Sequence, residues 1–220
     1  MTSDPTPRFR VGTALVSLVE PPAGRAREYD RWYERDHFYP GMLAGPHCFA
    51  GRRWAAPRRL KDLPGALGRG SFLHTYWIEE AAHMAFMDWA REAYARLGAE
   101  GRLFDSVEHV DTSFHALDSW AARETDGVPP EVALDHPFPG LVVVRGGEPP
   151  PAVGAVVLRV SMTSLPTEGF PDDPAELHLL FLDADPASVW GEVVRDDAGH
   201  SWAAAFVPTV PGTDRHVEDM

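Results

Sequence analysis

The chain has 220 residues and a mass of 24.2 kDa; 44% of its residues are hydrophobic and 24% are charged. This composition is typical of a globular protein with a buried core, and it excludes a wholly disordered chain. The formal net charge of -13 repels phosphate groups, so neither nucleic acid nor an anionic membrane surface is expected as a partner.

Along residues 1–124 the sequence predicts four strands and two helices. Runs rich in β-branched and aromatic residues favour strands at 11–19, 71–78 and 107–117, and a further strand, with a pair of arginines, is expected at 48–55. Apolar residues at helical spacing favour helices at 25–39 and 79–98, and the pair Pro40-Gly41 is expected to end the first helix. The order βαββαβ is that of a ferredoxin-like unit.

Residues 125–220 predict a second ferredoxin-like unit that is degenerate. Strands are expected at 141–145, 155–162, 177–183 and 201–210, with one helix at 186–195 that Asp185 caps. The other helix is replaced by a loop, at 146–154 or at 167–175. A loop rich in proline and acid, residues 126–139, separates the two domains, and nearly all of the acidic excess lies in residues 125–220, which include this loop.

The expected fold class is therefore α+β, with two tandem ferredoxin-like units. Two such units can pack sheet on sheet and close a barrel whose lumen is expected to hold a pocket. The sequence leaves open whether the units pair within one chain, as a pseudo-dimer, or across a homodimer.

Cysteine content and the lack of a long apolar run place further limits on the protein. The single cysteine, Cys48, excludes an internal disulfide and a cysteine-rich metal site. No apolar run approaches the ~20 residues that a membrane-spanning helix needs, and the first residues lack the apolar centre of a secretory signal peptide. We therefore expect a cytoplasmic protein.

The densest cluster of reactive side chains lies in the first predicted helix. Trp32 and Tyr33 are expected to face the sheet to bury their large rings, and His37 lies one turn later on the same face. At a helix end the dipole favours the protonated imidazole, and Asp36 acts in the same direction, whereas burial favours the neutral form. A histidine held between these effects exchanges protons near neutral pH. We predict that His37 moves a proton and that Asp36 or Tyr33 orients it.

Alternation along the third strand supplies partners for this histidine. His74 and Tyr76 share one face, which is less uniformly apolar than its opposite, so we expect this face to line the barrel interior. There His74 and Tyr76 are predicted to position or polarise a carbonyl group of a small hydrophobic or aromatic substrate. The residues expected to bind that substrate are Trp32, Phe72, Arg52 and His109.

The segments EYDRWYERDHFYPGM and PHCFAGRRW resemble the first helix and second strand of the EthD-like branch of the dimeric α/β-barrel superfamily, in its double-length form. That branch has the motif W-Y-x-x-x-H at the end of its first helix, which Trp32, Tyr33 and His37 match. The resemblance implies a small-molecule cavity with this histidine at its edge. The relatives include ring-closing cyclases of polyketide pathways, lactone isomerases and cofactor-free monooxygenases. The second unit lacks the motif, so one site per chain is expected.

The expected function is a cofactor-independent enzyme that acts on a small aromatic or polyketide-like molecule by general acid–base catalysis, as a cyclase, isomerase or dehydratase. Two alternatives stay open: a cofactor-free monooxygenase in the same pocket, and a non-catalytic module that binds a small ligand or serves a stress response. Structural roles also stay open, in which His37 caps a carbonyl or pairs with Asp36, and His74 packs within the sheet. No residue pattern selects haem or a metal ion, so no cofactor is expected.

Overall fold

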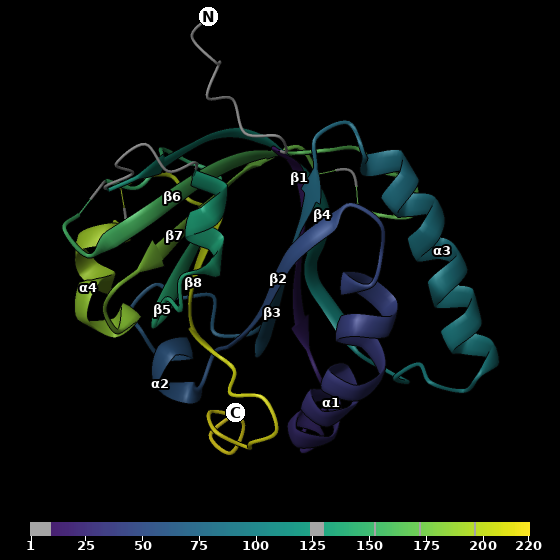
Figure 1. The fold of residues 1–220 in the computed structure, drawn as a ribbon. Helices are drawn as coiled ribbons and strands as arrows, with labels where there is room; N and C mark the ends of the chain where they lie inside the picture. The colour runs from purple at the N-terminus through teal and green to yellow at the C-terminus, as the bar shows by residue number, and fades with distance from the viewer. Residues whose placement is uncertain (1–9, 124–129, 152, 172, 196) are drawn as a thin grey trace, which may run out of the picture.

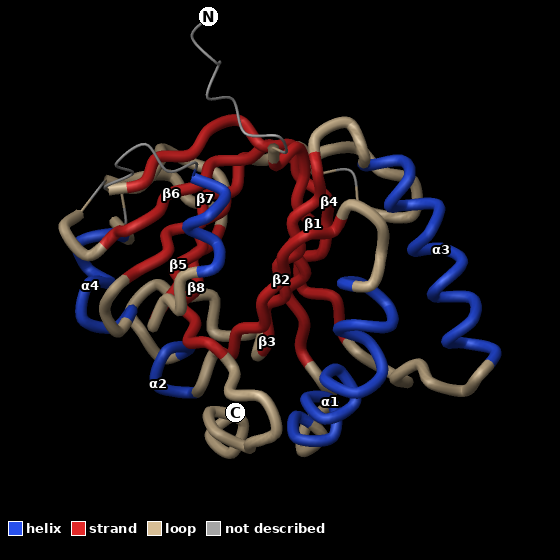
Figure 2. The backbone as a smooth tube through the Cα atoms, in the orientation of Figure 1, coloured by secondary structure: helices blue, strands red, loops and turns tan. Residues whose placement is uncertain are grey.

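The computed structural model describes residues 10–123, 130–151, 153–171, 173–195 and 197–220. Its strands form one closed barrel in the order β1-β3-β2-β8-β5-β7-β6-β4, in which neighbouring strands are antiparallel (Figures 1 and 2). The strands are β1 (Val11–Glu20), β2 (Cys48–Ala55), β3 (Phe72–Glu79), β4 (Glu108–Ala122), β5 (Gly140–Arg145), β6 (Val156–Ser164), β7 (Glu176–Leu182) and β8 (Trp202–Pro208).

Helices cover the outside of the barrel on two sides. Figure 1 shows α1 and α3 beside the first four strands, and α2 and α4 beside the last four. Among the described residues, no helix combines the length and the apolar character that a membrane crossing requires. The helices are α1 (Ala26–Trp32), the π-helix η1 (Tyr33–Leu43), α2 (Arg58–Lys61), α3 (His83–Ala99), the 3-10 helix η2 (Pro130–Asp135) and α4 (Pro186–Val193).

Both halves of the barrel have the same strand order, β4-β1-β3-β2 in the first and β8-β5-β7-β6 in the second. The mixed α+β class expected from the sequence is therefore confirmed. The halves join along β4 and β6 over seven residue pairs, whereas β2 and β8 pair in the described chain at two positions, Trp54 with Pro208 and Ala55 with Val207. The predicted domain boundary, after residue 124, falls at residues outside the described ranges and stays a prediction.

The barrel interior is a packed apolar core rather than the expected pocket. Aromatic rings from both halves meet there, among them Trp54, Trp77 and Phe181. The prediction that His74 and Tyr76 line this interior is wrong, because they lie on the outer face of β3, under the helices, in a second buried cluster. Alternation indicates which side chains share a face, but both faces of β3 are buried, one with His74 and the other with Thr75, so polarity cannot decide which of them points inward.

The first helix runs further than the sequence predicts. α1 continues directly into η1, a wider helix that passes through Pro40 and ends at Leu43. In an α-helix a proline removes one hydrogen bond and its ring contacts the carbonyl four residues earlier, and the wider register of a π-helix relieves that conflict. The expected stop at Pro40-Gly41 is therefore wrong, and His37 lies within the helix instead of at its end.

The last helix begins as the sequence predicts. The Asp185 carboxylate accepts a hydrogen bond of 2.9 Å from the backbone N–H of Ala187, and Pro186 occupies the first turn. The described residues between β5 and β6, and those between β6 and β7, contain no helix. The outer face of the second sheet is packed against α2 and α4, through Leu60 and Trp190.

Candidate functional site

A cavity of about 380 Å³ lies between the outer face of the first sheet and the helices η1 and α3, and we call it the helix-side cavity. The side chains that α3 buries fall on one face of that helix, and this face covers the cavity. Phe86, Met87 and Leu97 of α3 line it together with Phe114 of β4, so most of its wall is apolar. Such a cavity suits a flat hydrophobic molecule.

The imidazole of His37 forms part of the cavity wall. It stacks on Trp32 at a centroid distance of 5.1 Å and meets the edge of Tyr33 at 4.8 Å. A Cβ atom at Gly41 would lie 3.1 Å from Nδ1 of His37, so glycine gives the ring its room. Burial, and the neighbouring His109, lower the pKa of His37 to about 4. The ring is therefore neutral at pH 7.

Within the described residues, no hydrogen bond holds this imidazole. Nδ1 of His37 is buried without a partner, and the described part of the chain offers none to Nε2 either. A neutral imidazole always has one nitrogen that accepts rather than donates. His37 is therefore available to a ligand in the cavity as a hydrogen-bond acceptor or as a metal ligand.

Asp36 does not orient His37, contrary to the sequence-based prediction. Its carboxylate accepts hydrogen bonds from Arg35 at 2.6 Å and from Arg102 at 2.9 Å. Burial disfavours its charge, but these two hydrogen bonds outweigh burial and lower the pKa of Asp36. Neighbouring residues on a helix do not face each other, so a side chain adjacent in sequence to His37 points elsewhere.

His74 lies on the same side of the sheet as His37 but outside the cavity. It is fully buried, its ring stacks on Tyr33 at 3.7 Å, and its Nε2 is 3.0 Å from the hydroxyl of Tyr29. Burial, and then the nearby charge of Arg53, hold the pKa of His74 well below its usual range. Because Tyr33 lies between the two imidazoles, the structure does not bring His37 and His74 together as one site.

The remaining predicted residues divide between the cavity and the core. Tyr76 lines the cavity, and its hydroxyl is 2.7 Å from that of Tyr33, which also lines it. His109 lines the cavity as well, with its Nδ1 at 3.0 Å from the hydroxyl of Thr112. Phe72 is buried in the core beneath α1 and does not reach the cavity.

Trp32 and Arg52 lie away from the cavity interior. The indole N–H of Trp32 donates to the carbonyl of Arg102 at 2.6 Å, while its ring supports His37 from behind. Arg52 belongs to a different cavity at the mouth of the barrel. Of the predicted residues, Tyr33, His37, Tyr76 and His109 share the helix-side cavity.

A buried ion cluster beside this region was not foreseen from the sequence. Arg53 is 5% exposed; it binds the carboxylate of Asp30 and lies 3.1 Å from that of Glu34. Asp30 and Glu34 stand four residues apart and therefore on one helix face. That spacing, opposite an arginine on the neighbouring strand, is the signal that could have found the cluster.

A second cavity adjoins the first, and we call it the rim cavity. Its volume is about 680 Å³, and it shares Tyr94, His109, Thr112 and Phe170 with the helix-side cavity. Arg145 lines the rim cavity and pairs with Asp111 at 3.1 Å. Across the described ranges, no three His, Cys, Asp or Glu side chains gather closely enough to hold a metal ion by themselves.

Comparison with known proteins shows the fold. No family model matches the sequence, and no curated protein is significantly similar to it. A protein assigned as a chlorite dismutase aligns with 96% of this chain and 100% of its own, at a TM-score of 0.56 and 13% identity. The encapsulated DyP-type peroxidase of Mycobacterium smegmatis aligns with 90% of this chain and 93% of its own, at a TM-score of 0.53 and 10% identity. A DypB variant of Rhodococcus jostii RHA1, solved in complex with haem, aligns with 91% of this chain and 94% of its own, at a TM-score of 0.51 and 10% identity.

These comparisons correct the resemblance to the EthD-like branch. The solved structures that align with nearly the whole chain include a protein assigned as a chlorite dismutase and DyP-type peroxidases, and the barrel closes within one chain. The helix motif was misleading because aromatic rings at helical spacing also serve to pack a helix on a sheet in unrelated proteins.

The cofactor-independent acid–base function is corrected as well, together with its cyclase, isomerase and dehydratase forms, its cofactor-free monooxygenase alternative and its non-catalytic one. The neighbours of this fold are named as enzymes of another type, and one of them is solved with haem. In this chain the pKa of His37 is about 4 and Asp36 faces away, so His37 does not exchange protons near neutral pH. At identities of 10–13%, the chain shares with these proteins an architecture.

Proposed function

We propose that this protein is a haem-binding oxidoreductase that holds haem in the helix-side and rim cavities, with His37 as the iron ligand. The observation that carries the proposal is the neutral imidazole of His37, which has no partner in the described chain and lines an apolar cavity. A neutral imidazole is the form that binds a metal, and histidine is a common ligand of haem iron. The fold neighbours include a protein in complex with haem.

The size of the two cavities fits such a group only when both are used. A cavity of about 150 Å³ holds one benzene, so each non-hydrogen atom needs about 25 Å³. The helix-side cavity, at about 380 Å³, therefore takes part of a haem, and the adjoining rim cavity, at about 680 Å³, takes the remainder. His109 and Phe170 line both cavities, so the two cavities lie directly beside each other.

The side chains of the two cavities match the chemistry of haem. Phe86, Met87 and Phe114 offer apolar contacts to a flat ring. Arg91 lines the helix-side cavity and Arg145 the rim cavity, and guanidinium groups bind carboxylates such as those of haem. Both already pair with carboxylates of the chain, Arg91 with Asp88 at 2.9 Å and Arg145 with Asp111 at 3.1 Å, so the carboxylates of haem would take the place of these partners. When bound, haem supplies the redox chemistry after which the peroxidases of this fold are named.

The residues of this chain would hold and shield the group. Trp32 and Tyr33 fix the plane of the His37 ring by stacking and edge contacts. The apolar residues of α3 exclude water from the same space. A hydrogen bond of 2.7 Å between the hydroxyl groups of Tyr76 and Tyr33 holds Tyr76 in place in the cavity wall.

Haem titration of the purified protein tests the proposal. We expect one haem per chain, with the absorption band of a histidine-bound haem. His37→Ala should weaken binding at least tenfold, and free imidazole should restore the band, because it replaces the missing ligand. His47→Gln, at an exposed histidine that lines neither cavity, is the matched control and should bind within about threefold of the wild type.

Two outcomes would contradict the proposal. One is the absence of stoichiometric haem binding by the folded wild type, and the other is a His37→Ala variant that binds haem as well as the wild type does. Oxidoreductase activity is tested separately, by peroxide-dependent oxidation of a dye with the loaded protein. Activity equal to that of free haem would limit the function to haem binding.

A further inference from the structure

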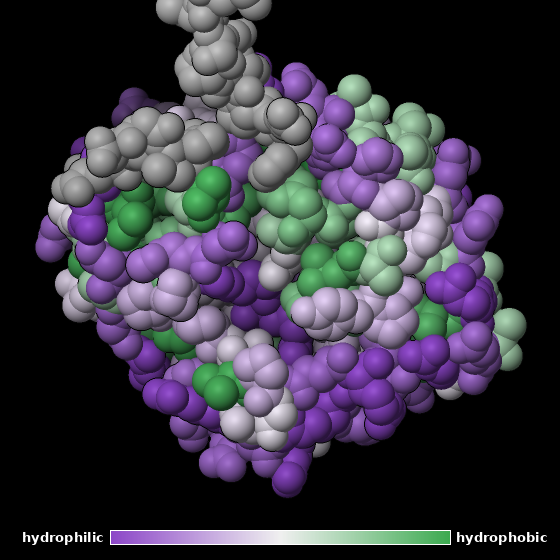
Figure 3. Space-filling model, in the orientation of Figure 1, coloured by the Kyte–Doolittle hydropathy of each residue, from purple (hydrophilic) through white to green (hydrophobic). Residues whose placement is uncertain are grey.

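A third cavity lies at the mouth of the barrel, and we call it the barrel-mouth cavity. It has a volume of about 560 Å³. It opens next to residues 51–53 of β2, which precede the two positions at which β2 pairs with β8. Figure 3 shows this face of the molecule hollowed near its centre, between the two halves of the barrel. The cavity shares no lining residue with the helix-side or the rim cavity, so it is independent of the proposed haem site.

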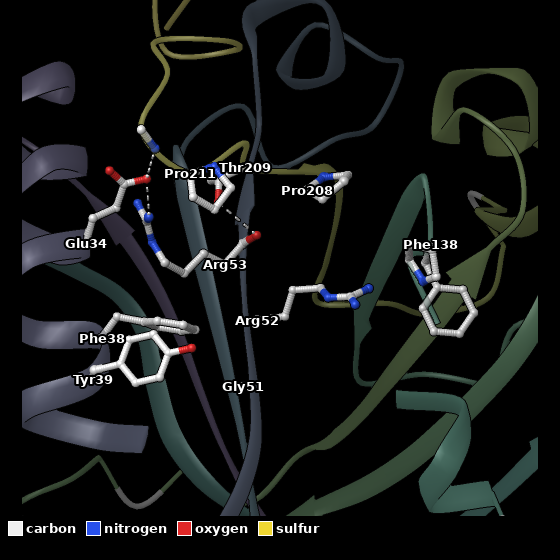
Figure 4. Close-up of a pocket in the computed structure, with 12 residues that line it drawn as sticks. Glu34, Phe38, Tyr39, Gly51, Arg52, Arg53, Phe138, Pro208, Thr209 and Pro211 are labelled. Carbon is white, nitrogen blue, oxygen red and sulfur yellow. Dashed lines mark hydrogen bonds and ion pairs between the residues drawn. The ribbon is translucent and has the colours of Figure 1, made fainter. Parts of the chain in front are cut away.

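Arg52 and Arg53, two consecutive residues of β2, both line this cavity, and their side chains point to opposite sides of it. Figure 4 shows Arg53 directed to Glu34, and Arg52 directed across the cavity toward Phe138. Arg53 is neutralised by its ion pairs with Asp30 and Glu34. Within the described residues Arg52 has no carboxylate at ion-pair distance, and Nη1 donates to the carbonyl of His136 at 2.7 Å.

The guanidinium of Arg52 is half-buried and lacks a counter-ion. Burial lowers the pKa of Arg52, and Asp135, which lies beyond ion-pair distance, opposes this only in part. A charge removed from water without a partner is costly, whereas a bound anion turns the same charge into a favourable contact. Arg52 therefore favours an anion in this cavity.

The free edge of Arg52 has the geometry of a carboxylate receptor. With Nη1 committed to His136, Nε and Nη2 remain without a hydrogen-bond partner in the described chain. These two N–H groups lie side by side and can donate in parallel to both oxygens of one carboxylate. The ring of Trp54 lies 5.5 Å from the guanidinium carbon and holds its plane in place.

The other walls of the cavity are aromatic and apolar. Phe38 and Tyr39 of η1 line one side and Phe138 the other, as Figure 4 shows, and Pro208 and Pro211 close the end. Tyr39 is 63% exposed, so its ring is free to cover a bound molecule. At about 25 Å³ per non-hydrogen atom, a cavity of this size holds a molecule of two or three rings.

Glu34 is the acidic side chain in the lining, and it does not oppose an anion. Its carboxylate already accepts hydrogen bonds from Arg31 at 3.0 Å and from the backbone N–H of Gly212 at 3.0 Å, in addition to its ion pair with Arg53. Its charge is therefore compensated on the side away from Arg52.

We propose that the barrel-mouth cavity binds a small aromatic carboxylate, whose anionic group pairs with Arg52 and whose rings lie between Tyr39 and Phe138. This is a second ligand site, apart from the haem site and built from different elements of the fold.

Calorimetric titration with 2-naphthoate tests this proposal, with naphthalene-2-carboxamide as the uncharged molecule of the same shape. We expect the wild type to bind the carboxylate at least tenfold more tightly than the amide. Arg52→Gln should abolish that preference while leaving the weak binding of the amide unchanged, which also shows that the variant is folded. Arg69→Gln, an exposed arginine paired with Glu108, is the matched control and should bind both molecules like the wild type.

Three results would overturn the proposal: equal affinity for the two molecules, an unchanged preference in Arg52→Gln, or loss of naphthoate binding in His37→Ala. The last result would place the probe in the helix-side cavity. Haem binding by Arg52→Gln should equal that of the wild type, so failure of this site and failure of the haem site are told apart.

Discussion

Buried neutral imidazoles make the free energy of unfolding of this protein depend on pH. His115 is 1% exposed, and burial, followed by the charge of Arg145, lowers its pKa to about 4. His37 and His74 are shifted in the same direction, also mainly by burial. In the unfolded chain each of these rings takes up a proton near pH 6.5, whereas in the folded chain it does not.

The sign of the resulting pH dependence follows from proton binding. Between pH 6.5 and about 4 the unfolded state binds the proton on His115 and the folded state does not, so the free energy of unfolding falls as the pH falls. We expect His115→Gln to remove about 2 kcal/mol of the fall between pH 7 and 4.5. Urea unfolding at both pH values measures it. A fall of equal size in the variant would show that His115 is accessible to protons in the folded state.

At the residue scale, the sequence located His37 but not its surroundings. The spacing of Trp32, Tyr33 and His37 indicates a shared helix face, and all three rings are in contact in the structure. The expected partnership with Asp36 failed because a helix turns neighbouring side chains apart, and the partner of Asp36, Arg102, is distant in sequence. Cavity-lining residues such as Phe170 come from a loop that no periodic pattern describes.

Helix α4 offers a direct measure of one helix cap. Asp185→Ala removes the acceptor of the Ala187 N–H and is expected to cost about 1 kcal/mol of stability. Asp185→Asn keeps an acceptor but loses the exposed ion pair with Arg59 at 2.9 Å, so it should cost less than half as much. Chemical denaturation of the three proteins compares them. Equal losses in both variants would assign the effect to the ion pair instead of the cap.

At the element scale, the strands were easier to predict than the C-terminal end of the first helix. β1 was expected at 11–19 and is observed at Val11–Glu20, because a run rich in β-branched residues that is bounded by turn residues carries that signal locally. The π-helix η1 was not predictable, since its register depends on how Tyr33 and Met42 pack against the sheet and not on helix propensity. The orientation of β3 needed the second half of the chain, which supplies the other wall of the core.

The two seams that close the barrel differ in length, and this defines a prediction for the whole molecule. β2 pairs with β3 along its length but pairs with β8 only at Trp54 and Ala55 in the described chain, whereas β4 and β6 pair over seven positions. Amides of β2 before Arg53 that point away from β3 should therefore exchange with solvent faster than those of β4 that face β6. Hydrogen exchange followed by mass spectrometry measures both, and equal protection would contradict the short seam.

A ligand in the barrel-mouth cavity would stabilise the closed barrel at its short seam, between β2 and β8. The barrel-mouth cavity is walled by β2 on one side and by Pro208 and Phe138 of the second half on the other. A molecule seated there contacts both halves, and each tenfold excess over its dissociation constant adds about 1.4 kcal/mol to the closed state. The resistance of the chain to heat and to proteases would then rise and fall with the cellular level of one metabolite.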